Sequence, residues 1–407
     1  MSQVCIVIGA SHAAAQFVQS LRQEGWEDRI LVIGEEPYIP YHRPPLSKEF
    51  LAGDKELDEI YLRPAKVYEE LNVEFLLETR IEAIDPEGKR LTLSVGDSVT
   101  YDKLCLTVGS RVRTVDLPGV NLGGVHYLRT VQDVEAIREG IRPGANAVIV
   151  GGGYIGLEAA AVLNKLGMKV TVLEMAERVL QRVTAPEVSE FYTRVHGEEG
   201  VEIRCDTGVS GFEGNDHVER VRCSDGSVLE ADLVVIGVGI VPNTELASAA
   251  GLEVENGIVV DEYARTSNAD IVAAGDCTFH YNPVYERRVR LESVQNATDQ
   301  ARIAAATVCG KKKPYNALPW FWSDQYDVKL QIAGLSQDYE ETQVRGDRKN
   351  GRSFAIFYFR DNKIIAVDAV NKPAEFMMGK RLITEKAEVD RKQLADESIH
   401  MREFLKR

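Results

Sequence analysis

The feature that most constrains the fold is a strand, glycine turn, helix and strand unit that occurs twice in the 407 residues. In the first copy the β-rich run Val4–Ile8 enters a turn at Gly9, and a helical stretch leads to a second apolar run, Arg29–Ile33. In the second copy Ala147–Val150 enters a turn at Gly151. Apolar runs separated by a helical periodicity are typical of βαβ units, so the sequence predicts two of them.

The repeat extends beyond these two units. Asp102–Gly109 resembles Asp232–Gly239 in length and apolar pattern, and each follows a hairpin-like turn built from Gly, Asp and Ser. Matched order and spacing in both halves predict two copies of one dinucleotide-binding module.

The C-terminal part is predicted to be a third, smaller domain. A helix over 294–308 leads to a linker at Lys311–Pro314. Beyond the linker we expect strands near Lys329–Ala333, Ser353–Phe359 and Lys363–Ala369, and then a helix after Pro373 that Met377 and Met378 help to pack.

The two glycine turns have the composition that binds a pyrophosphate. Glycine lets the backbone turn sharply and approach a phosphate, whose charge is favoured at a helix N-terminus. The second turn carries Gly151, Gly153 and Gly156. The first turn keeps Gly9 but has Ser11 and Ala14 at the other two positions, next to Ala13.

An acid follows the second strand of each unit. These acids are Glu35 and Glu174, and Glu174 lies about 20 residues beyond its glycine turn, as ribose recognition requires. A carboxylate there accepts hydrogen bonds from a ribose diol and repels a 2′-phosphate, so Glu174 favours NADH. Arg178 leaves NADPH as an alternative, and each acid has the alternative of being a solvated strand end.

Composition excludes several classes of protein. The net charge of −15 disfavours a nucleic-acid partner. The six scattered cysteines have neither CxxC nor zinc-site spacing, so we expect reduced thiols, no redox dithiol and no metal. The longest apolar stretch, Leu233–Val241, is too short for a membrane helix, and the N-terminus lacks a basic signal region. A cytoplasmic protein without a membrane partner is expected.

Two adjacent dinucleotide sites without a catalytic cysteine pair predict an electron relay. One site is expected to hold a flavin and the other to receive nicotinamide. The chemistry is then that of the cofactors, and the protein aligns the rings and adjusts the local charge.

Several longer segments resemble a known family. They are Gly9–Ala14, Arg43–Lys48, Tyr127–Thr130, Gly151–Glu158, Ala274–Asp276 and Trp320–Gln325. Together they resemble the FAD-dependent ferredoxin reductases that serve bacterial cytochrome P450 monooxygenases and aromatic-ring dioxygenases, over nearly the whole chain.

The resemblance implies an α/β, glutathione-reductase-like fold, with two Rossmann-type domains and a smaller α+β C-terminal domain. The FAD domain is expected over 1–111 and 244–318, the NADH domain over 112–243 and the C-terminal domain over 319–407. By motif position, the implied FAD contacts are Ala13, Glu35, Arg43, Lys48, Ile81, Arg129, Asp276, Val294 and Trp322.

Physical arguments support some of these roles. Asp276 follows a strand and a glycine and is suited to accept a hydrogen bond from the ribityl chain, while the N–H group of Val294 opens a helix. The alternatives are that Asp276 is an ordinary cap and that Val294 is a core residue. Lys48 and Glu158 are expected to pair near flavin N5, unless Glu158 is a solvated helix residue. Tyr154 either gates nicotinamide or packs between domains.

A [2Fe–2S] ferredoxin is the implied partner. Because such proteins are acidic, docking needs a local positive patch. The candidates by family position are Arg63, Arg302, Lys329 and Lys380. The expected activity is NADH-dependent ferredoxin reduction in electron transport. The alternatives are a rubredoxin reductase, an NADH oxidase of the same fold, and a flavoprotein like apoptosis-inducing factor.

Overall fold

The computed structural model describes residues 3–405, and these form two compact units. The first unit contains residues up to 42, 57–111 and 240–319, and the second contains 43–56, 112–239 and residues from 320 onward. The predicted division of the chain into three domains stays a prediction.

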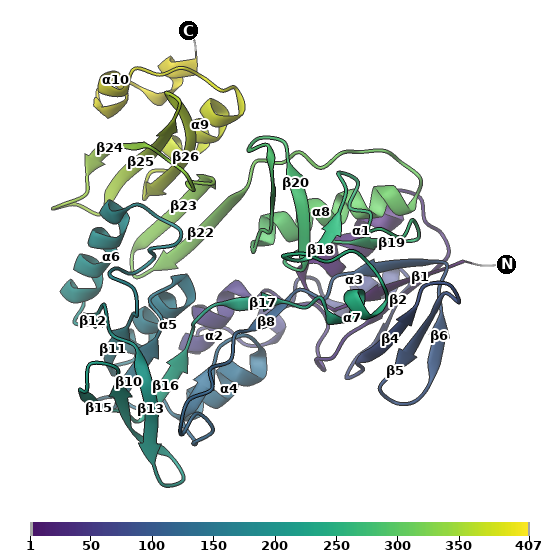
Figure 1. The fold of residues 1–407 in the computed structure, drawn as a ribbon, viewed down its shortest axis with the longest axis horizontal. Helices are drawn as coiled ribbons and strands as arrows, with labels where there is room; N and C mark the ends of the chain where they lie inside the picture. Colours follow the sequence, from purple (N-terminus) through teal and green to yellow (C-terminus); the bar gives the residue numbers. More distant parts are fainter. Residues whose placement is uncertain (1–2, 406–407) are drawn as a thin grey trace. The chain divides into compact units, whose positions relative to one another are not determined.

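The first unit is built on a parallel five-stranded sheet in the order β19-β7-β1-β2-β3, of which β1, β2 and β19 are labelled in Figure 1. The central strand β1 lies between β2 and β7, and its register pairs Ile8 with Ile33 and with Leu106. The strands are β1 (Val4–Ile8), β2 (Arg29–Ile33), β3 (Val73–Leu76), β7 (Lys103–Leu106) and β19 (Ile271–Ala273).

Helix α1 (His12–Gln23) packs against α8 (Val294–Val308) beside this sheet (Figure 1). Their contact is rich in alanine, with Ala13, Ala14, Ala301 and Ala304 all buried, so the two helices approach closely. The unit also contains α3 (Ala65–Glu70), β4 (Ile81–Asp85), β5 (Arg90–Leu93), β6 (Ser98–Thr100), α7 (Glu245–Ala249), β18 (Ile258–Val260), β20 (Thr278–Asn282) and β21 (Arg287–Val289). Strands β8 (Ser110–Val112) and β17 (Ile240–Pro242) lie where the chain leaves and re-enters this unit.

The second unit repeats the arrangement in a parallel sheet of order β12-β11-β10-β16-β9. Here β10 lies between β11 and β16, as β1 lies between β2 and β7, which is the relation that the sequence repeat predicts. The elements are α2 (Glu49–Ala52), β9 (Val125–Tyr127), α4 (Val131–Glu139), β10 (Asn146–Val150), α5 (Tyr154–Lys165), β11 (Lys169–Leu173), α6 (Pro186–Glu198), β12 (Glu202–Arg204), β13 (Val209–Gly214), β14 (Val218–Cys223), β15 (Val228–Glu230) and β16 (Leu233–Ile236).

The C-terminal part of the second unit is an antiparallel sheet in the order β22-β23-β26-β25-β24, with α9 packed on β23 and β26. Its elements are β22 (Trp320–Gln325), β23 (Val328–Gly334), β24 (Glu341–Asp347), β25 (Ser353–Arg360), β26 (Lys363–Val370), α9 (Pro373–Thr384) and α10 (Arg391–Ala395). The sequence interpretation of Met377 as a packing residue is wrong, since Met377 is 53% exposed. The helix packs instead through Phe376 and Leu382, which are on its buried face.

Candidate functional site

The two glycine turns share the same backbone conformation at their first glycine. Gly9 and Gly151 have φ values of +101° and +108°, which side chains of L residues rarely adopt. A Cβ at Gly9 would lie 2.3 Å from the carbonyl oxygen of Thr107, and one at Gly151 would lie 2.4 Å from that of Gly237. Each turn therefore passes against the end of the neighbouring strand, β7 or β16, and only glycine fits there.

Each glycine turn leads into a helix whose N-terminus is not capped by a side chain. Ser11 is the N-cap of α1 and Gly153 is the N-cap of α5, and neither helix has a side-chain cap hydrogen bond. A Cβ at Gly153 would meet no atom within 4 Å. The first N–H groups of a helix need a partner, so these residues fit a bound pyrophosphate.

The two acids after the second strands have different surroundings. Glu35 is exposed, with Arg80 Nε 3.7 Å from its Oε1. Glu174 accepts hydrogen bonds from the N–H groups of Gly152 and Ala176, at 2.7 and 2.8 Å. Its carboxylate is therefore fixed against the glycine turn, while Glu35 has the exposure of a solvated strand end.

Lys48 and Glu158 form a buried ion pair in the second unit. Lys48 Nζ lies 2.6 Å from Glu158 Oε2, and the side chains are 13% and 4% exposed. The same oxygen accepts a hydrogen bond from Ser47 Oγ at 2.5 Å, and Glu158 Oε1 accepts one from Ser323 Oγ at 2.6 Å. The alternative of a solvated helix residue at Glu158 is therefore wrong. Such a cluster holds one positive charge beside a carboxylate whose two oxygens are both engaged by protein donors from separate chain segments.

Strand β22 presents different side chains on its two faces, because successive residues alternate. On one face Phe321 lies with its ring centroid 4.8 Å from that of Tyr154, and Ser323 reaches Glu158. On the other face the rings of Trp320 and Trp322 lie 5.6 Å apart. The ring centroids of Phe321 and Trp322 are 6.4 Å apart, so aromatic rings follow one another from Tyr154, at the second glycine turn, into the C-terminal sheet.

In the first unit, Asp276 lies close to the first glycine turn in the fold. Ser110 Oγ donates a hydrogen bond to Asp276 Oδ2 at 3.0 Å. A Cβ at Gly275 would lie 3.5 Å from that of Ala13, so the strand end that carries Asp276 packs on the start of α1. Val294 is half-buried as the first residue of α8.

Comparison with known protein families assigns most of the chain. Residues 3–301 match the family described as pyridine nucleotide-disulphide oxidoreductase, and residues 320–405 match the reductase C-terminal family. The chain belongs to the pyridine nucleotide-disulphide oxidoreductase family. It is therefore an oxidoreductase that works with FAD and a pyridine nucleotide, which confirms the predicted fold class and cofactors.

Relatives of this oxidoreductase agree with the predicted resemblance. Putidaredoxin reductase CamA of Pseudomonas putida is 44% identical over 406 residues, which are 98% of this chain and 96% of the relative. The ferredoxin reductase subunit of the 5,5'-dehydrodivanillate O-demethylase of Sphingobium sp. (strain NBRC 103272 / SYK-6) is 43% identical, with 98% of each chain covered. The solved covalent putidaredoxin reductase–putidaredoxin complex matches with a TM-score of 0.96 at 43% identity, over 99% of this chain and 98% of that chain.

The predicted pairing of Lys48 with Glu158 is present in this oxidoreductase. Two further predicted FAD contacts also meet each other, since Arg43 Nη1 donates a hydrogen bond to the carbonyl oxygen of Arg129 at 2.7 Å. Ile81 is the first residue of β4 and is 7% exposed in the core of the first unit. The binding roles assigned to these residues, and to Gly9, Ser11, Ala13, Ala14, Glu35, Gly151, Gly153, Gly156, Glu174, Asp276, Val294 and Trp322, stay predictions.

Tyr154 is half-buried, and its hydroxyl is enclosed without a hydrogen-bond partner among residues 3–405. Its ring contact with Phe321 lies within the second unit, so packing between domains stays one of the two predicted alternatives. The gating role stays a prediction.

Sequence reasoning missed Ser47, Ser323 and Phe321. Each is next to a predicted residue, Lys48 or Trp322, in a segment that carries the family resemblance. Neutral hydroxyls have no spacing rule of their own, so only the contact with Glu158 reveals them.

Membrane-spanning helices and metal clusters are both absent from the part of the chain that the structure describes. No helix between residues 3 and 405 is both long enough and apolar enough to cross a bilayer. The same residues contain no group of three or more His, Cys, Asp or Glu side chains suited to hold a metal ion. All six cysteines carry free thiols.

A second buried carboxyl lies in the C-terminal sheet. Asp368 on β26 is fully buried, and its Oδ2 accepts a hydrogen bond from the Tyr358 hydroxyl at 2.5 Å. That hydroxyl accepts one from the N–H group of Ala185, which precedes α6, at 2.9 Å. Burial raises the pKa of Asp368 to about 7, against the smaller opposing effect of the Tyr358 hydrogen bond.

Replacing Asp368 with asparagine is expected to change how stability depends on pH. In the unfolded chain this carboxyl ionises near the ordinary aspartate pKa of 3.8, whereas the folded protein keeps its proton up to about pH 7. The free energy of unfolding of the wild type is therefore lowered by this carboxyl as pH rises from about 4 to about 7, and the lowering is constant above that. The free energy of unfolding in urea of Asp368→Asn, measured relative to that of wild type, should increase by about 2 to 3 kcal/mol between pH 5 and pH 8.

The control for this measurement is Asp361→Asn, an exposed acid at the turn between β25 and β26. Its unfolding should follow the wild-type curve at each pH. A difference between Asp368→Asn and wild type that does not change with pH would contradict the expectation.

Proposed function

We propose that the protein is an NADH-dependent ferredoxin reductase, with FAD at the first glycine turn and NADH at the second. The partner is a [2Fe–2S] ferredoxin that supplies a P450 monooxygenase or a ring-hydroxylating dioxygenase. The buried Lys48–Glu158 pair carries the proposal, because it places a charge pair beside the helix that follows the second glycine turn. The relatives named above are a putidaredoxin reductase and the ferredoxin reductase subunit of an O-demethylase.

The residues suited to hold FAD in the first unit are Gly9, Ser11, Ala13 and Ala14, at the start of α1, together with Asp276. When bound, FAD supplies the acceptance of a hydride and the release of electrons one at a time. The protein's own part is to fix the dinucleotides and to hold charge. The ammonium of Lys48 favours negative charge that develops nearby, and Glu158 keeps that ammonium in place.

Two side chains of the second module support NADH rather than NADPH. Glu174 is fixed by backbone N–H groups at the position suited to a ribose diol. Arg178 is already engaged within the protein, because its Nη1 donates to the carbonyl oxygen of Thr184 and to Ser189 Oγ, at 3.0 and 2.7 Å. It is therefore not presented to a 2′-phosphate. The free thiols of the six cysteines support a cytoplasmic site of action.

Two measurements test this function. Rapid mixing of the FAD-loaded protein with NADH should bleach the flavin band near-stoichiometrically, and a flavin that stays oxidised would overturn the proposal. Cytochrome c reduction should then depend on added ferredoxin. Equal cytochrome c reduction without a ferredoxin indicates the oxidase class, and activity with rubredoxin alone indicates a rubredoxin reductase. In the rapid-mixing measurement, slow flavin reduction with a long-lived charge-transfer complex indicates a flavoprotein like apoptosis-inducing factor.

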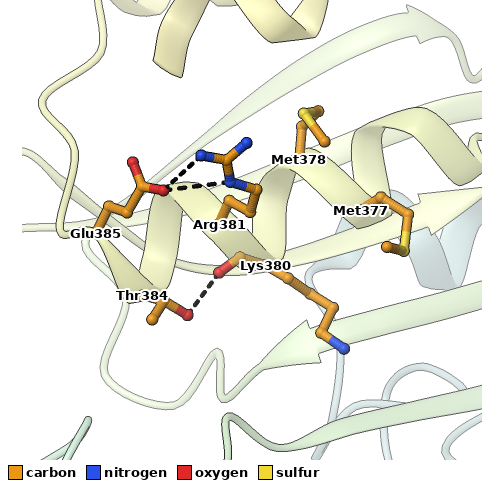
Figure 2. Close-up of a pocket in the computed structure, with 6 residues that line it drawn as sticks. All are labelled: Met377, Met378, Lys380, Arg381, Thr384 and Glu385. Carbon is orange, nitrogen blue, oxygen red and sulfur yellow. Dashed lines mark hydrogen bonds and ion pairs between the residues drawn. The ribbon is translucent and has the colours of Figure 1, made fainter. Parts of the chain in front are cut away.

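The four candidate docking cations have different surroundings. Arg63 donates to Gln19, and exposed Arg302 pairs with Asp299, within the first unit. In the second unit, Lys329 is exposed on β23, and Lys380 Nζ lies over the ring of Trp320 at 5.4 Å. Lys380 also lines a surface pocket with Met377, Met378, Arg381, Thr384 and Glu385 (Figure 2). An exposed methionine beside a lysine is suited to a partner with an acidic rim and an apolar centre.

Replacing Lys380 with glutamate is expected to raise the KM for ferredoxin about tenfold at low salt, because a like charge then faces the acidic partner. The effect should shrink as ionic strength rises. Flavin reduction by NADH should stay unchanged. The control is Lys392→Glu, which makes the same charge change at an exposed position on α10. An equal rise of KM in both variants would show that net charge, not this face, is sensed.

A further inference from the structure

The second oxygen of the Glu158 carboxylate accepts from one protein donor among residues 3–405. Oε2 accepts from both Ser47 and Lys48, whereas Oε1 accepts from Ser323 Oγ at 2.6 Å. Ser323 has no exposed surface, so water does not replace this donor. The orientation of the carboxylate therefore depends on a residue of β22.

Ser323 is itself part of a chain of hydrogen bonds. Gln325 Nε2 donates to Ser323 Oγ at 3.2 Å, and Gln325 Oε1 lies 2.8 Å from His196 Nε2 on α6. Ser323 and Gln325 are two residues apart on one strand, so they share a face. Gln325 and His196 are buried, with exposures of 2% and 0%.

The chemistry of the three side chains sets the direction of every bond. An amide oxygen only accepts, so His196 Nε2 carries the proton toward Gln325. The Gln325 amide then donates to the Ser323 oxygen, whose own proton points to Glu158. Burial lowers the pKa of His196, so its ring is neutral and has one N–H group to give. Each donor thus points toward the carboxylate.

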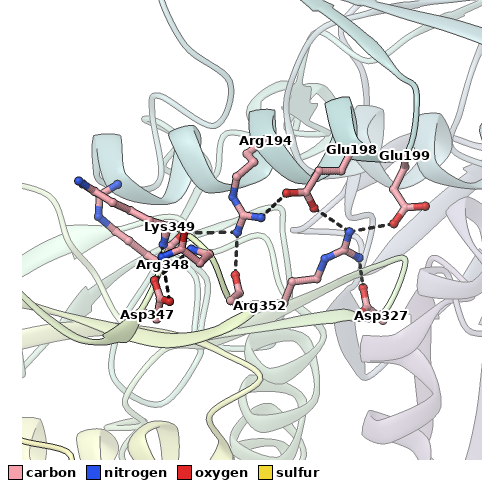
Figure 3. A network of polar contacts seen from close by, with 10 residues as sticks. Arg194, Glu198, Glu199, Asp327, Asp347, Arg348, Lys349 and Arg352 are labelled. Carbon is pink, nitrogen blue, oxygen red and sulfur yellow. Dashed lines mark hydrogen bonds and ion pairs between the residues drawn. The ribbon is translucent and has the colours of Figure 1, made fainter.

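The far end of this chain is held by an ionic network (Figure 3). Arg352 pairs with Asp327, Glu198 and Glu199, and therefore joins the turn after β22 to the end of α6. Arg194 Nη2 donates to the carbonyl oxygen of Gly351 at 2.7 Å. His196 lies between Arg194 and Glu198 in sequence, so the network fixes the helix turn that presents its ring.

We propose that Ser323 is a positioning residue for Glu158, and that Gln325 and His196 fix the direction of its hydroxyl. This inference rests on the proposed function, in which Glu158 acts with Lys48. These hydrogen bonds link α6, through β22, to the carboxylate on α5. The charge pair therefore depends on the C-terminal sheet. Loss of the Ser323 hydroxyl leaves Oε1 without a donor and lets the carboxylate rotate away from Lys48.

The test is a double-mutant cycle between Ser323 and Glu158 in the FAD-loaded protein. Ser323→Ala should slow flavin reduction by saturating NADH about tenfold, as expected for a lost hydrogen bond to a charged group. The NADH concentration that gives half of the maximal rate should change less than about twofold, because binding is not removed. In a Glu158→Ala background, Ser323→Ala should have no further effect. The same tenfold loss in both backgrounds would overturn the proposal.

A readout that does not depend on turnover accompanies the rates. The midpoint potential of bound FAD is expected to become more positive in Glu158→Ala, because a negative charge is removed. Ser323→Ala should shift it in the same direction by a smaller amount, with no further shift in the double variant. An unchanged potential in Ser323→Ala, beside a shift in Glu158→Ala, would overturn the positioning role.

Gln325→Leu separates positioning from a general structural effect. It leaves the Ser323 hydroxyl in place, so its rate loss should be smaller than that of Ser323→Ala, whatever its unfolding midpoint. Rates that follow the unfolding midpoints of the two variants would contradict the proposal. A wild-type protein that NADH does not reduce would instead contradict the proposed function, so the two failures are distinguishable.

Discussion

Replacing Lys48 with methionine is expected to slow flavin reduction by NADH about a hundredfold, the usual loss when a preorganised electrostatic group is removed. Methionine has nearly the shape of the lysine stem but no charge. Glu158 is 4% exposed, and Lys48 is its only cationic partner among the ion pairs of residues 3–405. The variant therefore loses the cation and leaves a buried carboxylate with only the two serine hydroxyls. Stopped-flow absorbance of the FAD-loaded protein measures the rate.

The same variant should also be less stable, because removing one partner of a buried pair typically costs about 3 to 5 kcal/mol. The matched control is Lys66→Met, which removes an 81% exposed lysine that lies 3.9 Å from Glu70. That change should alter neither the rate nor the urea midpoint measurably. A Lys48→Met protein that is reduced within about twofold of the wild-type rate would show that the charge pair has no part in hydride transfer.

Local sequence patterns were sufficient for the elements that surround the glycine turns. Strands Val4–Ile8 and Arg29–Ile33 and helix Val294–Val308 begin and end as predicted, because apolar residues and turn residues bound them sharply. Strand Trp320–Gln325 was not predicted, since tryptophan, serine, aspartate and glutamine do not alternate between apolar and polar residues. Its burial comes from contacts with α5 and β23.

The site shows the same difference between local patterns, which the sequence reveals, and tertiary contacts, which it does not. Lys48 and Glu158 were identified from family segments, but their pairing is a contact between residues 110 positions apart. Ser323 lies 165 positions from Glu158, and no spacing in the sequence joins the two. Phosphate turns are local structures and are therefore visible in sequence, whereas a charge cluster assembled from three segments depends on tertiary packing.

The helix α9 shows why burial is difficult to predict from residue type. Methionine is a flexible apolar residue that packs in cores and also serves at binding surfaces. Met377 was expected to pack, but Gly379 takes the position that approaches Val367 on β26, and Met377 is left exposed. The helix face therefore depends on which residue fits the sheet most closely.

Arg345 is expected to be the most sensitive position for the stability of the C-terminal part. It is 4% exposed on β24, and its Nε lies 3.1 Å from Glu375 Oε1 on α9. Its Nη1 donates to the carbonyl oxygens of Leu394 and Asp396, at 3.0 and 2.5 Å, and its Nη2 donates to that of Ile399 at 2.8 Å. One guanidinium therefore ties the last segment of the chain to the sheet.

Arg345→Met should lower the free energy of unfolding by about 3 to 5 kcal/mol, because it leaves a buried carboxylate and three carbonyl oxygens without their donor. Hydrogen exchange should rise selectively over residues 391–405. The control is Arg381→Met, whose pairing with Glu385 is exposed and worth less than about 0.5 kcal/mol (Figure 2). Adding Glu375→Leu to Arg345→Met should recover part of the loss, since the buried carboxylate, left with only the more distant Lys372 Nζ at 4.0 Å, is then gone. Unchanged exchange in Arg345→Met would mean that apolar packing of Leu394 and Phe404 alone holds this segment.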